Sequence, residues 1–166
     1  MKLSTVKRQA VFILVNHVYV GTRCYEKKRK LLNTIGFSLG EGTRVVGPIH
    51  CTALLTVGEN CWLGAGLEIY GNGSVVIGDN CDIGPKVVFL TGSHEIGNQH
   101  RRAGIGKNEE IRIGSGCWIG GRATLLGGIQ VGEGSVLGAC SCAVKDIPEN
   151  RLCCGVPARE VRKLHE

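Results

Sequence analysis

His94 is the residue whose type and position best suit chemistry near neutral pH. It lies in the stretch FLTGSHEIG, residues 89–97, where a regular pattern of glycines and aliphatic residues stops. Histidine changes charge closest to neutrality, so an imidazole held on a rigid element can act as a general base. His94 could equally do no more than cap the last regular strand, and the pattern alone leaves both interpretations open.

A long segment follows His94 before the pattern returns. Phe89 and Ile113 occupy successive positions of a series that otherwise advances by six residues. About 18 extra residues are therefore extruded as a loop, predicted over 94–112, and a loop of this length in a compact protein is often functional. Besides His94 it contains His100 and Arg101.

The nine cysteines give a weaker chemical signal. Cys61, Cys81 and Cys117 each follow a position of the series by four residues, which predicts small buried side chains rather than nucleophiles or ligands. The other pairs lack the second ligand pair of a zinc site: Cys140 with Cys142, and Cys153 with Cys154. We therefore expect reduced thiols, no metal and a cytoplasmic protein without a secretion signal.

A six-residue repeat must position these groups. It runs through fifteen positions: 39, 45, 51, 57, 63, 69, 77, 83, 89, 113, 119, 125, 131, 137 and 143. Twelve of them are Leu, Ile or Val, and Gly follows nine. A strict period of six fits short strands joined by tight turns, three to a coil of about 18 residues. Residues 37–145 are predicted to form a parallel β-helix of about five coils.

The N-terminal segment, residues 1–36, is distinct from the repeat and carries a net charge of +7. Its apolar run 10–20 is too short to span a bilayer, and it predicts a short amphipathic helix packed on the body. The basic stretch 23–30 is interpreted as a solvated helix face, or as part of a weak contact of residues 1–30 with an anionic membrane surface.

The C-terminal segment, residues 146–166, predicts a turn followed by a short basic helix. Arg159, Arg162 and Lys163 would then share one face of that helix. Beyond residue 36 the chain has a net charge of −1, and its few aromatic residues do not alternate with basic ones. Nucleic-acid binding is therefore not expected.

Four motifs resemble those of the hexapeptide-repeat acyltransferases, in particular the maltose and galactoside O-acetyltransferase branch. They are TGSH (91–94), IGSGCWIGGRATLLGGIQVGEGSVLGA (113–139), VKDIPEN (144–150) and GVPAREVRK (155–163). The likeness covers roughly residues 57–163. It implies an all-β fold, a left-handed parallel β-helix, assembled as a homotrimer with active sites between subunits. It also implies acetyl-CoA as donor and a hydroxyl, usually of a sugar, as acceptor.

The resemblance further implies roles for single residues. His94 matches the family's catalytic histidine, which would take the proton from the acceptor hydroxyl. The backbone N–H of Gly121 would stabilise the oxyanion or contact coenzyme A. Asn72 and Arg101 are the implied acceptor-binding residues. The other positions that match coenzyme A contacts are Ala139, Val144, Lys145, Arg159 and Arg162.

The chain also departs from that branch. Its N-terminal segment differs, and Gly64 and Asn72 stand where the branch has polar residues that contact the acceptor. We therefore expect a sugar-containing precursor of a surface polysaccharide rather than free maltose or a galactoside. The alternatives are a small non-sugar acceptor such as an antibiotic or serine, and an amino-sugar nitrogen. A further alternative is a β-helix with a binding or structural role, or one that holds a metal. The metal-bound form would need more converging histidines than His94 and His100.

Overall fold

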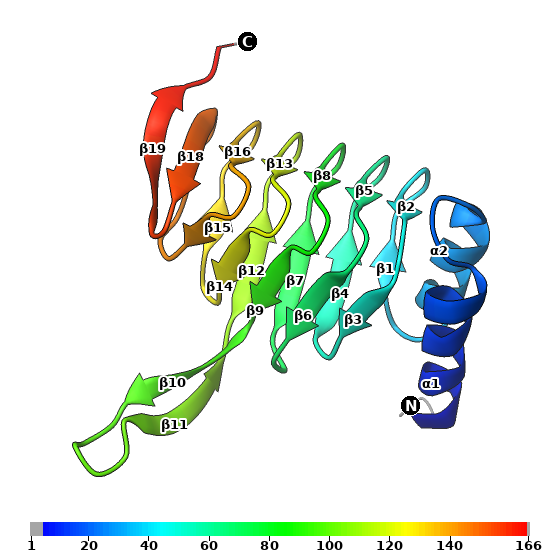
Figure 1. The fold of residues 1–166 in the computed structure, drawn as a ribbon, viewed down its shortest axis with the longest axis horizontal. Coiled ribbons are helices and arrows are strands. Elements are labelled where there is room, and N and C mark those ends of the chain that lie inside the picture. Colours follow the sequence, from blue (N-terminus) through cyan, green and yellow to red (C-terminus); the bar gives the residue numbers. More distant parts are fainter. Residues whose placement is uncertain (1–4, 166) are drawn as a thin grey trace.

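The protein, described here over residues 5–165 of a computed structural model, is a parallel β-solenoid with two short helices at one end. Each turn of the solenoid contributes one strand to each of three sheets, which we name A, B and C. Figure 1 shows the coils stacked along the long axis, with the helices beside the first coil and the C-terminal hairpin at the other end.

The three sheets are parallel except at the C-terminal edge of sheet B. Sheet A contains β1 (Ser38–Leu39), β4 (Leu54–Val57), β7 (Ser74–Ile77), β12 (Glu110–Ile113) and β15 (Gln130–Val131). Sheet B contains β2 (Arg44–Val45), β5 (Trp62–Leu63), β8 (Asp82–Ile83), β13 (Trp118–Ile119), β16 (Val136–Leu137), β18 (Arg151–Gly155) and β19 (Ala158–Lys163). Sheet C contains β3 (Ile49–Cys51), β6 (Leu67–Tyr70), β9 (Val88–Leu90), β14 (Thr124–Leu126) and β17 (Cys142–Ala143).

The six-residue repeat is confirmed position by position. All fifteen of its residues lie in strands of the three sheets, and none is more than 4% exposed. Because side chains alternate between the two faces of a strand, these residues point inward and stack on their equivalents in the next coil. The solenoid extends beyond the predicted end at residue 145, since Ile147 bridges Val131 and β18 adds a strand of a sixth turn.

Three of the buried cysteines belong to one column at the turn between sheets A and B. Thr43, Cys61, Cys81, Cys117 and Ser135 occupy equivalent positions in successive coils and are at most 2% exposed. Each donates its hydroxyl or thiol hydrogen to a backbone carbonyl of the following coil, at 2.7 to 3.1 Å. The expected core thiols are confirmed, and the column needs small side chains that can also donate a hydrogen bond.

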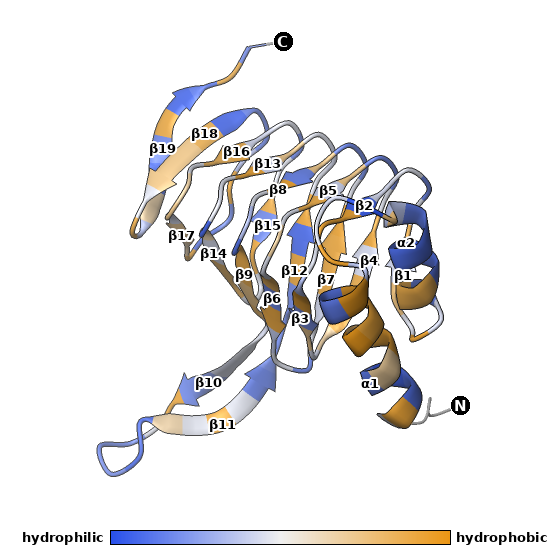
Figure 2. Cartoon of the chain, turned by 45° about the vertical axis from the view of Figure 1, so that its right-hand side comes forward, coloured by the Kyte–Doolittle hydropathy of each residue, from blue (hydrophilic) through white to orange (hydrophobic). Residues whose placement is uncertain are grey.

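The N-terminal segment is helical, as predicted, although its first four residues lie outside the described part of the chain. It consists of α1 (Thr5–Ile13), a π-helical stretch η1 (Leu14–Val18) and α2 (Tyr25–Asn33). Val11, Val15 and Leu32 are buried in the core. Figure 2 shows that α1 carries both hydrophilic and hydrophobic residues. Within residues 5–165 no helix has the length and hydrophobicity to cross a membrane.

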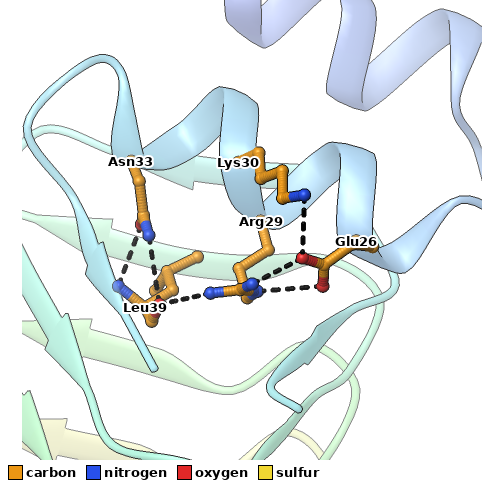
Figure 3. Close-up of polar contacts among 5 residues, drawn as sticks. All are labelled: Glu26, Arg29, Lys30, Asn33 and Leu39. Atoms are coloured by element: carbon orange, nitrogen blue, oxygen red, sulfur yellow. Dashed lines mark hydrogen bonds and ion pairs between the residues drawn. The ribbon is translucent and has the colours of Figure 1, made fainter. Parts of the chain in front are cut away.

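Two asparagines join this segment to the first coil by pairing with strand backbone. The Asn16 side chain accepts from the Ile49 N–H and donates to the Ile49 carbonyl, both at 2.9 Å. The Asn33 side chain makes the same pair of bonds with Leu39 at 2.9 and 3.1 Å (Figure 3). An open sheet edge exposes unpaired backbone groups, so these contacts close the first coil of the solenoid.

The basic stretch of α2 is only partly the solvated face that its sequence suggested. The Lys28 ammonium is buried and donates to the carbonyls of Gly21 at 2.7 Å and Val46 at 2.9 Å. Burial lowers the pKa of Lys28. Arg29 reaches the Leu39 carbonyl at 3.3 Å (Figure 3). Part of the N-terminal charge therefore holds α2 on the solenoid.

The predicted loop over 94–112 is an antiparallel β-hairpin, which we call the arm. It consists of β10 (Gly92–Ile96) and β11 (Ala103–Asn108), and it projects away from the solenoid in Figures 1 and 2. The chain leaves the solenoid after β9 and returns at β12, so the arm interrupts the repeat without disturbing the stacking of sheet A, where β7 pairs directly with β12.

The predicted C-terminal helix is wrong. Residues 158–163 form β19, which turns back at Val156–Pro157 and pairs antiparallel with β18. β18 lies at the end of sheet B and offers free backbone groups, whereas a helix of about six residues is unstable without tertiary packing. Arg159, Arg162 and Lys163 therefore lie along a strand. Residue 166 lies outside the described residues.

Candidate active site

His94 lies in β10, in the first strand of the arm. Its imidazole is exposed and makes no hydrogen bond or ion pair within residues 5–165, which does not support a purely structural role as a strand cap. Gly106 faces it across the arm, and a Cβ at that position would lie 3.8 Å from the imidazole Cδ2 and Nε2 atoms. Glycine there leaves one face of the imidazole open to a ligand.

The base of the arm is fixed to the solenoid through Thr91. Its buried hydroxyl donates to the Tyr70 carbonyl at 2.8 Å and accepts from the Gly73 N–H at 3.2 Å. Asn108, the last residue of β11, accepts from the Asn72 N–H at 2.9 Å. Asn72 therefore lies at the base of the arm, at the same corner of the solenoid from which His94 projects. Sequence reasoning missed Asn108, because no pattern links residues 36 positions apart.

Arg101 lies at the far end of the arm. The turn at this end is closed by bonds from the Gly97 N–H to the Arg102 carbonyl at 2.9 Å and from the Arg101 N–H to the Asn98 carbonyl at 3.2 Å. His94 and Gly97 are three positions apart along the extended chain, a length of about 10 Å. One chain therefore does not place Arg101 beside the imidazole, although both were predicted for the same site.

Gly121 and Ala139 occupy the corner between sheets B and C in successive coils. The Cys140 N–H donates to the Gly121 carbonyl at 3.0 Å, and this bond joins the two coils. The Gly121 N–H donates to no group within residues 5–165. A free N–H at a fixed corner can donate to a ligand oxygen, as the predicted oxyanion or coenzyme A contact requires.

Val144 and Lys145 follow β17 at the corner between sheets C and A, two coils beyond the arm. Lys145 and Arg159 line one pocket of about 270 Å³, which also includes Cys153 and Glu160. The pocket also contains the Asp146 and Glu160 carboxylates, but Glu160 pairs with Arg151 at 3.1 Å and Asp146 accepts from the Gln130 N–H at 2.8 Å. The two cations can therefore bind a phosphate group. Arg162 pairs with Leu152 in the β18–β19 register, and its side chain is exposed.

Most of the predicted site residues form three groups in one chain, and Arg101 and Arg162 belong to none of them. His94 and Asn72 share the arm's corner, Gly121 and Ala139 share the B–C corner, and Lys145 shares a pocket with Arg159. Among residues 5–165 no cluster of three or more His, Cys, Asp or Glu side chains could hold a metal ion. The chemistry that these groups can perform without a metal is proton transfer, oxyanion stabilisation and binding of an anionic ligand.

Comparison with known proteins identifies the class to which this solenoid belongs. Residues 110–142 match the family model described as bacterial transferase hexapeptide, and residues 55–86 match the hexapeptide repeat of succinyl-transferase. The galactoside O-acetyltransferase of Escherichia coli K12 is 32% identical over 85% of this chain and 70% of its own length. The chain belongs to the hexapeptide-repeat acetyltransferases.

Solved structures agree with this family. A hexapeptide-repeat acetyltransferase of Vibrio cholerae O1 biovar eltor, complexed with acetyl coenzyme A, has a TM-score of 0.83 and 26% identity over 97% of this chain and 87% of that chain. A maltose O-acetyltransferase of Clostridium difficile 630 has a TM-score of 0.75 and 29% identity over 95% and 84%. The resemblance to the maltose and galactoside branch is thus confirmed, and the protein is an acetyltransferase.

Proposed function

We propose that this acetyltransferase transfers the acetyl group of acetyl-CoA to a sugar hydroxyl, with His94 as the general base. The observation that carries the proposal is the exposed, unpartnered imidazole at the point where the arm interrupts the repeat. The donor is supported by the Vibrio cholerae relative bound to acetyl coenzyme A, and the sugar acceptor by the galactoside and maltose acetyltransferases.

The reaction needs one proton relay and one oxyanion donor. His94 takes the proton of the acceptor hydroxyl while that oxygen attacks the thioester carbonyl. The resulting oxyanion accepts a hydrogen bond from the Gly121 N–H, and its collapse breaks the C–S bond. The departing thiolate takes the proton from the imidazolium, which restores the neutral base. A general base of this kind contributes on the order of 10²–10⁴-fold to the rate.

Lys145, Arg159 and Arg162 are proposed to bind the phosphates of coenzyme A, with Ala139 and Val144 beside its chain. The pocket that Lys145 shares with Arg159 supports this assignment. Asn72 and Arg101 are proposed to bind the acceptor, Asn72 from the base of the arm and Arg101 from its end.

A homotrimer with the active site between subunits fits the separation of these groups. On the arm, Ile96 is 89% exposed and Ile105 is 75% exposed. A two-stranded hairpin without further packing is only marginally stable in water. A neighbouring subunit that covers the arm would bury both residues and bring the arm's His94 to another chain's B–C corner. Light scattering that gives a monomer at micromolar concentration would contradict this arrangement.

The acceptor is proposed to be a precursor of a surface polysaccharide, handled in the cytoplasm with a weak contact between residues 1–30 and the membrane surface. Val6, Ile13, Val18 and Val20 are each more than half exposed on the N-terminal segment, which supports such a contact. Co-sedimentation with anionic vesicles that decreases with added salt is the expected result. Equal recovery in the supernatant with and without vesicles would contradict it.

Thiol release from acetyl-CoA, measured over a panel of sugars, nucleotide sugars and small hydroxyl compounds, tests the activity. We expect release that depends on a sugar acceptor, that falls at least 100-fold in His94→Ala and that persists in His100→Ala. His100 is an exposed histidine at the end of the same arm, so it controls for changes in the arm itself. Release with serine or an antibiotic but with no sugar would contradict the proposed acceptor class.

A further inference from the structure

Both tryptophans of the chain line one pocket on the outer face of sheet B. In the sheet register Asp82 pairs with Trp62 on one side and with Trp118 on the other, so the three side chains occupy successive rungs. Together with Ile83 and Gly84 they line an open pocket of about 330 Å³. Ligand pockets range over roughly 300–1,000 Å³, so this one suits a single ring of monosaccharide size.

The polar groups of this pocket have no partners in the protein. The Asp82 carboxylate is exposed and makes no hydrogen bond or ion pair within residues 5–165, and neither indole N–H donates a hydrogen bond there. The carboxylate lies between two tryptophans in the register of sheet B, and the π-systems of aromatic rings also attract cations. The pocket therefore favours a ligand with a positively charged hydrogen-bond donor and disfavours an anionic ligand.

A residue of the N-terminal segment supports one of the two tryptophans. Tyr25 of α2 packs on Trp62 with ring centroids 5.8 Å apart, and the Arg44 guanidinium lies 5.9 Å from the Tyr25 ring centre. Arg44 pairs with Trp62 on the side away from Asp82, so it does not neutralise the carboxylate. Trp118 is 58% exposed and open to a ligand.

The pocket adjoins the corner that carries Gly121. Gly84 lines the pocket, and a Cβ on Gly84 would lie 2.5 Å from the Gly121 nitrogen, so the two glycines are in close backbone contact. A ring held by the two tryptophans would therefore lie next to the N–H proposed to stabilise the oxyanion. This adjacency connects the pocket with the acceptor rather than with a remote ligand.

We propose that Trp62, Asp82 and Trp118 bind the acceptor and that the acceptor is an amino sugar. This inference rests on the proposed function and narrows its substrate class. The protonated amine donates to Asp82 while the sugar ring contacts the indoles. An ammonium has no lone pair with which to attack the thioester, so the amine serves recognition and a hydroxyl of the same sugar is acetylated.

Tryptophan fluorescence tests the inference without any turnover, because both fluorophores belong to the pocket. The full-length protein is titrated with glucosamine, glucose and glucuronate in the absence of acetyl-CoA. A charge-assisted hydrogen bond is about twice as strong as a neutral one, so we expect about tenfold tighter binding of glucosamine than of glucose. Glucuronate should bind most weakly.

Asp82→Asn keeps the shape of the side chain and removes its charge, and it should bring the affinities for glucosamine and glucose within about twofold. Glu133→Gln, an equal charge change at an exposed corner elsewhere, should leave the tenfold preference intact. Equal affinities in the unmodified protein, a preference that survives Asp82→Asn, or no fluorescence change with any sugar would overturn the inference. Acetylation of glucosamine at an unchanged rate in Asp82→Asn would overturn it while leaving the proposed function intact.

Discussion

Asn16→Ala is predicted to separate the N-terminal helices from the solenoid. The side chain makes two hydrogen bonds of 2.9 Å to the backbone of Ile49, in the first strand of sheet C. Each bond contributes about 1 kcal/mol net, and removal leaves an unpaired N–H and C=O at a half-covered sheet edge. We therefore expect a loss of roughly 2–3 kcal/mol in the free energy of unfolding.

For a chain of this length, 1 kcal/mol corresponds to a shift in melting temperature of about 2–4 °C. The Asn16→Ala variant should therefore melt about 4–12 °C below the unmodified protein in thermal unfolding followed by circular dichroism. Protein concentration must be held fixed, since assembly would stabilise the folded state. His17→Ala, at the exposed neighbouring residue, is the matched control and should melt within about 1 °C of the unmodified protein.

Asn16→Asp distinguishes the hydrogen bonds from simple loss of volume. The carboxylate can still accept from the Ile49 N–H, but its other oxygen faces the Ile49 carbonyl, and the two acceptors repel each other. A melting temperature as low as that of Asn16→Ala is expected. A normal melting temperature in Asn16→Ala would refute the view that these bonds secure the helices.

Three further predictions follow from the core and the site. Burial raises the pKa of the Cys51 thiol to about 11, so the stabilising contribution of the neutral thiol is complete below about pH 8.5 and is lost as the pH rises to 11. The difference in the free energy of unfolding between the unmodified protein and Cys51→Ala, measured by urea unfolding, should therefore shrink over that pH range. Gly120→Ala would drive a Cβ into the backbone of the next coil and should abolish soluble folded protein, whereas Gly106→Ala, with 3.8 Å of clearance, should express normally. Lys145→Ala and Arg159→Ala should each raise the KM for acetyl-CoA about tenfold at unchanged kcat, and a changed kcat at constant KM would argue against phosphate binding.

The solenoid was predictable because its signal is local and repeated. Each of the fifteen apolar positions reports the same environment, so the pattern gives the strands, the coils and the place where the arm leaves. The repeat also predicted small, buried side chains at the equivalent positions of Cys61, Cys81 and Cys117. The hydrogen-bonding requirement of these positions became visible only when Thr43 and Ser135 were found in the same column.

The errors have a common physical cause in contacts between distant segments. The C-terminal residues have basic side chains at helical spacing, yet the free edge of β18 fixes them as a strand. The sequence around Lys28 predicts a solvated cation. Its ammonium instead binds the carbonyls of Gly21 and of Val46, which lies 18 residues further along the chain. Asn72 and Asn108 meet at the base of the arm across 36 residues. No local pattern encodes such pairs.

The kcat of His94→Ala with a saturating sugar acceptor is the sharpest test of our proposal that His94 is the base of the acetyl transfer. We expect a fall of about 10²–10⁴ in kcat, with the dissociation constant for acetyl-CoA unchanged by calorimetry and with His100→Ala as active as the unmodified protein. A kcat within threefold of the unmodified protein would show that His94 is not the base.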